Sequence, residues 1–426
     1  MLMGGRSARG TSSVAAAQQT AADREVRSGG LIVAMGSRSP AVGPVVGRAG
    51  SATVGRAVAV GLLGVLTVLV SGCSGSPEAS GPGPSSAVSS APATPLAGPS
   101  AVTLTASPSP SPSPSPVFGW LSGASSDEAA KGTYGTWRGA AIQIGGTWDN
   151  GNAEQVEMRT ICPGGPWATW NAPLDVAVGA IDVDAGESWQ AAAAGAYTAR
   201  WRAHLTRLRQ CWGTRDPALL YIRFAHEMNL PQKWRVRGGQ EADFVKAITL
   251  YSNLRYELVP GARLVLCPND GTDAGLGGLD IRKLWPGHDA QGRPVADIYA
   301  VDSYNAAPHV TTAVEFRKKI NASYPNGMPL GLEKHRQLAQ KLGVPFAVAE
   351  WSNNGDPGSS NGGGESPVYL REFNAWLRSH SGNENAPLAG QVVYEVHFNL
   401  LEPFAFWPRT VQPQTAATYR SLTWGH

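Results

Sequence analysis

The sequence predicts a (β/α)8 barrel, the TIM-barrel fold of the α/β class, over residues 117–426. This part of the chain alternates short apolar runs with longer amphipathic stretches, the pattern of repeated βα units around a parallel sheet. There are eight apolar runs, as a closed barrel of this type requires. An open doubly wound sheet would usually carry a glycine-rich phosphate loop after its first strand, and no "GK[ST]" loop occurs in the sequence.

An apolar segment before this domain predicts export from the cytoplasm. Ala57 to Val70, "AVAVGLLGVLTVLV", carries no charge and is too short to span a bilayer comfortably, which favours a cleaved signal peptide. The next residues complete "VSGC", which resembles the lipobox of bacterial lipoproteins. This resemblance implies that Cys73 is lipidated and becomes the mature N-terminus. An ordinary secretory signal and an uncleaved anchor are the alternatives, and all three place the domain outside the cytoplasm.

The signal-peptide region is taken as residues 1–72, with Met35 as an alternative start, because the stretch before the apolar segment is long for a signal peptide. Residues 73–116 hold Cys73 and a linker rich in serine, proline, alanine and glycine. Such a composition cannot bury a core and favours an extended, disordered spacer. We expect a stalk that holds the domain on the extracellular face of the bacterial cell membrane, with the membrane as a partner through the lipid anchor.

The eight apolar runs are the predicted strands. They cover residues 117–123, 139–148, 174–181, 219–227, 262–269, 297–304, 345–351 and 390–398. Helical periodicity is visible between them, and each apolar stripe is expected to pack against the barrel. The stripes are Trp201, Leu205, Leu208 and Trp212; Phe244, Ile248, Tyr251 and Leu254; and Phe373, Trp376 and Leu377.

Composition and cysteine content limit the function classes. Hydrophobic residues make up 42% of the chain and the net charge is +3, with basic residues spread along the sequence, so a nucleic acid is not an expected partner. We expect a monomer. Beyond the linker, Cys162, Cys211 and Cys267 allow one intramolecular disulfide at most, and the sequence does not choose the pair. Their spacings do not match a zinc site.

Two of the predicted strands end in a glutamate, Glu227 in "RFAHEMN" and Glu350 in "AVAEWSNN". In a (β/α)8 barrel, chemistry is expected at the carboxyl ends of the strands. Glycoside hydrolysis needs two facing carboxyl groups, one as proton donor and one as nucleophile or base. Burial can keep one carboxyl protonated while hydrogen-bond donors keep the other ionised. The pair therefore predicts a glycosidase site that requires no metal or organic cofactor, although either glutamate alone is as consistent with a solvated carboxylate or a helix cap.

"RFAHEMN" also resembles the "R-P-x-H-E-M-N" stretch of glycoside hydrolase family 26, a family of clan A glycoside hydrolases best known for endo-β-mannanases. The resemblance covers most of residues 117–426. It implies that Glu227 is the acid/base and Glu350 the nucleophile of a retaining hydrolase that acts on β-linked polysaccharide, with β-mannan as the family's main substrate. The residues after each glutamate depart from the family, since "LPQKW" follows the first and Trp351 the second.

The same resemblance implies the substrate-binding residues. His226 would contact the sugar at the cleavage site, Arg223 would be an orienting charge in the barrel mouth, and Tyr304 in "VDSYN" would hydrogen-bond the nucleophile. Trp234 resembles the family's aromatic sugar platform. From the residues alone, His226 is also consistent with a buried core histidine.

Two further substrate-binding candidates rest on position. Asn229 ends the "RFAHEMN" motif and is equally consistent with a cap on the next turn. Trp351 is one of several tryptophans near strand ends where a sugar ring could stack, together with Trp120, Trp148 and Trp234.

Two other motifs in the chain fail on their context. A zinc-protease helix needs a second histidine four residues after His226, and position 230 is a leucine. "GSSNG" at residues 358–362 fits the spacing of a serine-hydrolase elbow but lies in a loop rich in glycine, serine and asparagine rather than between a strand and a helix.

Two alternatives to an enzyme remain. One is a carbohydrate-binding surface lipoprotein without turnover, and the other is a structural cell-wall protein.

The lipobox generates the first prediction. Replacing Cys73 with alanine should release the protein from the membrane fraction, because the thiol that would carry the lipid is gone. The measurement is the partition of both proteins between membrane and soluble fractions after expression in a bacterial host. Unchanged retention of Cys73→Ala in the membrane would indicate an uncleaved anchor instead.

Overall fold

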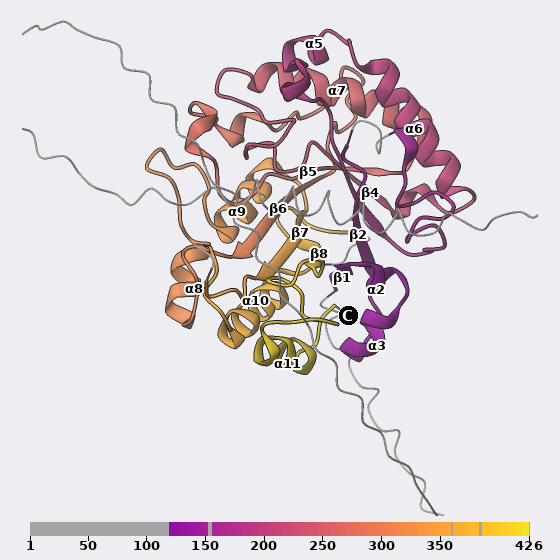
Figure 1. Cartoon of the computed structure of the whole chain (residues 1–426). Helices are drawn as coiled ribbons and strands as arrows, with labels where there is room; N and C mark the ends of the chain where they lie inside the picture. The colour runs from indigo at the N-terminus through magenta and orange to yellow at the C-terminus, as the bar shows by residue number, and fades with distance from the viewer. Residues whose placement is uncertain (1–118, 152–155, 359–360, 383–385, 426) are drawn as a thin grey trace, which may run out of the picture. The chain divides into compact units, whose positions relative to one another are not determined.

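Residues 119–151, 156–358, 361–382 and 386–425 are described by a computed structural model, and the predicted signal region, Cys73 and the linker lie outside them. Eight parallel strands close into a barrel in chain order, with β8 paired to β1. Helices surround these strands (Figure 1). The predicted (β/α)8 fold is confirmed.

All eight predicted strands are present. Their bounds are β1 Leu121–Ser125, β2 Ile144–Trp148, β3 Leu174–Val178, β4 Leu220–Phe224, β5 Arg263–Leu266, β6 Ile298–Asn305, β7 Phe346–Asn353 and β8 Val392–Phe398. Several predicted runs extend beyond the strand because apolar residues of the neighbouring loops are buried as well. Ile142, for example, is buried in the loop before β2.

The helices form the outer layer. They are α2 Asp127–Ala130, α3 Thr133–Arg138, α5 Trp189–Ala193, α6 Thr198–Trp212, α7 Glu241–Leu258, α8 Ala313–Ile320, α9 Leu332–Leu342, α10 Pro367–His380 and α11 Pro413–Ser421. Short 3-10 helices are η1 Val183–Ala185, η2 Pro217–Leu219, η3 Ala274–Leu276 and η4 Ile281–Lys283. In the described part of the chain no helix is both long and apolar enough to cross a bilayer.

The predicted apolar stripes of α6, α7 and α10 are all buried. The ring of Trp201 in α6 meets Phe224 of β4 at 5.4 Å and Tyr251 of α7 at 6.0 Å, both edge to face. One tryptophan thus joins two helices to the strand that leads into the "RFAHEMN" motif. Burying an aromatic side chain of this size stabilises the fold by about 1.5–3 kcal/mol.

The inside of the barrel is a separate, apolar core. Side chains alternate along a regular strand, and a register shift at Val393 of β8 brings Val393 and Tyr394 into this core together. The inward-facing set is Leu121, Ile144, Tyr221, Val265, Cys267, Ile298, Ala300, Ala347, Ala349, Val393, Tyr394 and Val396. The barrel is therefore filled through its middle.

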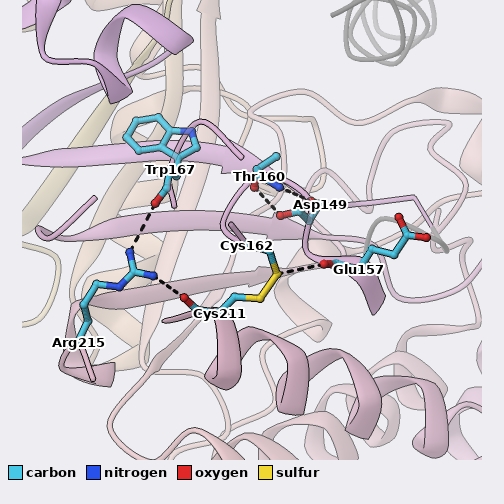
Figure 2. Close-up of a disulfide and its surroundings, with 7 residues drawn as sticks. All are labelled: Asp149, Glu157, Thr160, Cys162, Trp167, Cys211 and Arg215. Atoms are coloured by element: carbon cyan, nitrogen blue, oxygen red, sulfur yellow. Dashed lines mark hydrogen bonds between the residues drawn. A yellow bond between two sulfur atoms is a disulfide. The ribbon is translucent and has the colours of Figure 1, made fainter. Parts of the chain in front are cut away.

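A disulfide joins Cys162 to Cys211, and Cys267 is a buried free thiol. This settles the pairing that the sequence left open. The bond ties the segment after β2 to the last turn of α6, and Arg215 supports the same region by donating to the carbonyl of Cys211 at 2.7 Å (Figure 2).

Candidate active site

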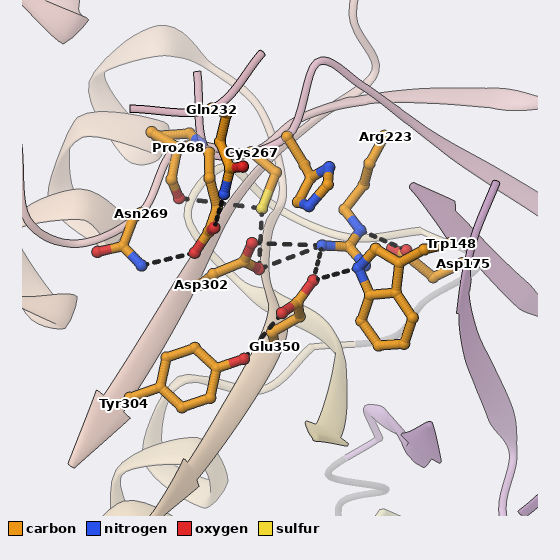
Figure 3. Close-up of polar contacts among 12 residues, drawn as sticks. Trp148, Asp175, Arg223, Gln232, Cys267, Pro268, Asn269, Asp302, Tyr304 and Glu350 are labelled. Carbon is orange, nitrogen blue, oxygen red and sulfur yellow. Dashed lines mark hydrogen bonds and ion pairs between the residues drawn. The ribbon is translucent and has the colours of Figure 1, made fainter. Parts of the chain in front are cut away.

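Charged side chains gather at the carboxyl ends of neighbouring strands. Arg223 lies in β4, Glu227 follows the end of that strand, Asp302 lies in β6 and Glu350 in β7. Figure 3 shows the polar contacts that connect the strands at this place. Because parallel strands of a barrel end on the same face, elements distant in sequence deliver these groups to one site.

Glu350 is directed into the site by a β-bulge in β7. The register between β6 and β7 shifts so that Asp302 pairs with Glu350 and Ala349 is left as an extra residue. Val348 packs outward against the helices, and strict alternation would turn Glu350 outward as well. The extra residue reverses this direction, and Trp351 takes the outward position in the helical core.

Three side chains donate hydrogen bonds to the carboxylate of Glu350. Arg223 Nη1 and Trp148 Nε1 reach Oε1 at 2.6 and 2.8 Å, and the hydroxyl of Tyr304 reaches Oε2 at 2.8 Å. Burial raises the pKa of Glu350, but the charge of Arg223 and the donated hydrogen bonds outweigh burial and lower the pKa below its ordinary value. Glu350 is therefore an ionised carboxylate at neutral pH.

Glu227 lies on a turn with an uncommon backbone conformation. Ala225 and Glu227 have φ angles of 53° and 51°, in the left-handed region that residues other than glycine rarely adopt. The turn is held by the amide of Ala225, which donates to the carbonyl of Val178 at 2.8 Å, and by the amide of Glu227, which donates to the carbonyl of Cys267 at 2.7 Å. Strain of this kind is concentrated at functional sites, where it aims a side chain.

The carboxyl group of Glu227 accepts hydrogen bonds from amide side chains. Asn269 Nδ2 donates to Oε1 at 2.8 Å and Gln232 Nε2 donates to Oε2 at 3.0 Å. The side chain is partly exposed, so it can exchange a proton with a ligand or with water. Asn269 also forms a β-bridge with Asp302, the register partner of Glu350. The two glutamates are thus linked through adjoining strands.

Arg223 is placed differently from the prediction. Its side chain is completely buried, so it does not face a substrate in the barrel mouth. It contacts three carboxyl groups instead: Asp175 at 2.5 Å, Glu350 at 2.6 Å and Asp302 at 3.3 Å. Its charge therefore acts on the carboxylate of Glu350 rather than on a group in the barrel mouth.

Three predicted substrate contacts are contradicted by burial. Trp351 is 0% exposed and donates to Glu395 at 2.5 Å, because the bulge turns it outward. Trp234 is 4% exposed and its indole N–H donates to the carbonyl of His226 at 2.6 Å, so it supports the turn rather than a sugar ring. Asn229 is 0% exposed and its side chain binds the backbone of Asn269.

Two further residues of the sequence prediction are also largely enclosed. The ring of His226 is 2% exposed and lies 5.3 Å from that of Trp234. Trp120, one of the tryptophans near strand ends, is 1% exposed. Tyr304 lies in the site and contacts Glu350, as the resemblance implies.

The sequence prediction missed several residues of the site. Asp175 and Asp302 contact Arg223, whereas Gln232 and Asn269 donate hydrogen bonds to Glu227. Polar residues at the ends of buried runs were a signal for Asp302 and Asn269, since both directly follow apolar stretches. Asp175 and Gln232 carry no such signal.

Aromatic rings cover the side of the site beside Glu350. Trp148 packs edge to face on Phe398 at 5.4 Å, and Phe404 meets Tyr304 and Phe398 at 5.2 and 5.8 Å. Trp148 and Phe404 remain partly exposed. Aromatic faces of this kind suit the apolar faces of sugar rings.

The chain is similar to several solved structures at TM-scores below 0.5. An endo-1,4-β-D-mannanase of Thermotoga petrophila is 11% identical with a TM-score of 0.43, covering 67% of this chain and 89% of that chain. Cel5A of Thermotoga maritima in complex with mannotriose is 8% identical with a TM-score of 0.42, covering 71% and 97%. A β-glycosidase of Pyrococcus horikoshii is 10% identical with a TM-score of 0.39, covering 67% and 84%. No protein-family model and no curated protein matches the sequence.

At 8–11% identity and TM-scores of 0.39–0.43, these likenesses say nothing of the chemistry of the site.

The buried charge of Arg223 generates the second prediction. Arg223→Met should lower the free energy of unfolding by about 3–5 kcal/mol at neutral pH, because it leaves buried carboxylates without their counter-ion. The loss should be smaller at mildly acidic pH, where the carboxyl groups can take up protons. The free energy of unfolding of both proteins is measured by urea unfolding at neutral and at mildly acidic pH.

The matched control is Arg202→Met. Arg202 forms an exposed ion pair with Glu257 between two helices, and its loss should change stability little. An equally small effect for Arg223→Met would show that the buried contacts do not stabilise the fold.

Proposed function

We propose that this protein is a retaining glycoside hydrolase that cleaves β-linked polysaccharide, with Glu350 as the nucleophile and Glu227 as the acid/base. The observation that carries this proposal is the different surroundings of the two glutamates. Glu350 is buried, ionised and held by Arg223, whereas Glu227 is partly exposed on a strained turn at an adjoining strand end.

The first step would use both groups at once. Glu350 Oε2 or Oε1 attacks the anomeric carbon while Glu227 gives its proton to the oxygen of the leaving sugar. The bond between the anomeric carbon and that oxygen breaks, and a covalent glycosyl ester forms on Glu350. Tyr304 and Trp148 would hold the attacking carboxylate in position, since both donate to it.

The second step would release the sugar. Glu227, now a carboxylate, takes a proton from water, and that water attacks the anomeric carbon of the ester. Two inversions at the same carbon give net retention. Partial exposure of Glu227 supports this role because the residue must meet both the leaving group and water.

β-Mannan is the substrate that we propose to test first. The proposal rests on the likeness of "RFAHEMN" to the mannanase motif, and the partly exposed rings of Trp148 and Phe404 would supply stacking surfaces. The residues that follow Glu227 and Glu350 differ from those of the mannanase family. The same test therefore includes other β-linked glycans. Release of reducing ends from a panel of neutral β-linked polysaccharides identifies the substrate.

The location of the enzyme is proposed from the leader sequence. A lipid on Cys73 and the Ser/Pro-rich linker would hold a monomeric barrel on the extracellular face of the bacterial cell membrane. There the enzyme would meet polysaccharide without the substrate having to cross the membrane.

The division of roles between the glutamates is the third prediction. Glu350→Ala should lower turnover of every substrate by roughly 10⁴-fold or more, because the attacking group is gone. Glu227→Ala should keep a fast first step on an activated aryl glycoside, which needs little protonation, and should accumulate the glycosyl-enzyme. Added azide should restore turnover in Glu227→Ala and give a β-glycosyl azide.

Glu257→Ala, which changes an exposed glutamate of α7, is the control and should leave turnover unchanged. Azide rescue of Glu350→Ala with a product of retained configuration would mean that the roles are reversed, because azide that replaces a missing nucleophile gives the inverted product. Wild-type activity in both site variants would place the chemistry elsewhere. Binding of glycan by a wild-type protein that releases no reducing ends would favour the non-catalytic alternative.

The fourth prediction concerns the pH profile. The acid limb of kcat/KM should report ionisation of Glu350, and Tyr304→Phe should move it to higher pH. The sign follows from the hydrogen bond: the Tyr304 hydroxyl stabilises the carboxylate and so lowers the pKa of Glu350, and its removal raises that pKa. Tyr251→Phe removes a buried hydroxyl in α7 and should leave the profile in place. An unmoved acid limb in Tyr304→Phe would remove Tyr304 from this role.

A further inference from the structure

One buried guanidinium is shared by three carboxyl groups. Arg223, Asp175 and Asp302 have completely buried side chains, and that of Glu350 is 6% exposed. If all three acids were ionised, the cluster would hold two negative charges more than Arg223 can neutralise. A buried carboxyl group without a counter-charge takes up a proton rather than remain ionised.

Hydrogen-bond geometry distinguishes the three acids. Asp175 receives the 2.5 Å contact from Arg223 and a 2.6 Å bond from the hydroxyl of Tyr394. Glu350 receives the 2.6 Å contact from Arg223 and two further donated bonds from neighbouring side chains. Each of these two acids therefore has strong donors that favour its ionised form.

Asp302 is the acid with the weakest partners. Arg223 Nη1 reaches its two oxygens at 3.4 and 3.3 Å, and the thiol of Cys267, a weak donor, lies at 3.2 Å. Nη2 of Arg223 is buried without a hydrogen-bond partner among the described residues, so the guanidinium does not form its usual two-point contact with Asp302.

The groups around Asp302 disfavour a further negative charge. Burial raises its pKa well above the ordinary value, the charge of Glu350 raises it further, and Arg223 only partly offsets this. Burial also raises the pKa of Asp175, and the charge of Arg223 and the hydrogen bonds from Tyr394 and Arg223 offset this only in part. The titratable and charged groups that face Asp302 are Arg223 of β4, Glu227 after β4, Cys267 after β5, Tyr304 of β6 and Glu350 of β7.

We propose that Asp302 carries a proton in the resting protein and so leaves the charge of Arg223 to Asp175 and Glu350. With Asp302 neutral, the cluster holds one negative charge in excess rather than two. Asp302 is then a positioning residue that acts through Arg223 on the proposed nucleophile. The consequence for catalysis rests on the proposed function, whereas the protonation of Asp302 does not.

Stability as a function of pH tests the proton. A carboxyl group whose folded-state pKa is raised contributes stability below its unfolded pKa and loses that contribution as pH rises through the folded pKa. Asp302→Asn, a neutral mimic of the acid, should therefore gain stability relative to wild type as pH rises from acidic to neutral. At neutral pH its urea midpoint should equal or exceed that of wild type.

Glu350→Gln is the matched control, and its trend should be opposite. The pKa of Glu350 is lowered, so its contribution to stability is present above the unfolded pKa and is lost as pH falls through the folded pKa. Relative to wild type, Glu350→Gln should thus lose more stability at neutral than at acidic pH. If Asp302→Asn follows this trend, or folds only at acidic pH, Asp302 is ionised and the proposal is overturned.

A second measurement can overturn the proposal on the wild-type protein alone. In the wild-type protein with isotope-labelled aspartate carboxyl carbons, at least one carbon should keep the NMR shift of a protonated acid at neutral pH, and this signal should be absent from Asp302→Asn. Titration of every aspartate in the ordinary acidic range would overturn the proposal even if Asp302→Asn does not fold. Neither measurement uses a glycan, so a failure of the proposed function would be seen separately.

Activity provides the readout of the positioning role. In Asp302→Asn the acid limb of kcat/KM should stay where the wild type has it, because a neutral group replaces a neutral group. Removal of an ionised neighbour would instead lower the pKa of Glu350 and move the limb to lower pH. Such a shift would contradict a proton on Asp302.

Discussion

The buried positive charge of Arg223 is the constraint on which the mouth of this barrel depends. A guanidinium removed from water is stable only when carboxyl groups surround it, and here they come from β3, β6 and β7. These partners meet Arg223 only when β3, β6 and β7 are brought together with β4 by closure of the barrel. We infer that the contact which keeps Glu350 ionised also favours correct closure of the barrel at this end.

Two irregularities of the backbone then convert a regular barrel into a site. The extra residue Ala349 turns Glu350 toward Arg223, and the left-handed turn at Ala225 and Glu227 carries the second carboxyl group past the end of β4. Neither follows from the alternation of side chains along a strand, and the turn is unfavourable locally. Both are held by contacts with neighbouring strands, so the regular part of the fold supports the strained part.

This explains which features the sequence could predict. The eight strands and the stripe of Trp201 on α6 follow from apolar periodicity, a local signal that the structure retains. The predicted substrate contact of Trp351 was wrong because a bulge shifts the side-chain alternation by one residue. No residue type marks this bulge in the sequence. The predicted sugar contact of Trp234 was wrong because its indole N–H donates to the carbonyl of His226 on the turn. The pairing of Cys162 with Cys211 and the contact of Asp175 with Arg223 depend on long-range geometry, which periodicity does not contain.

The two glutamates are supported by different parts of the fold, and this difference matters for the proposed reaction, which needs both. Glu350 is held by side chains of buried strands, which suits a group that must keep one position and one charge until it forms a bond. Glu227 stands on a turn, but its partner Asn269 is anchored by Asn229 and bridges to Asp302, the register partner of Glu350. The turn that carries Glu227 is therefore tied to the strand that carries Glu350 through Asn269 and Asp302, and it can present a partly exposed side chain without losing that connection.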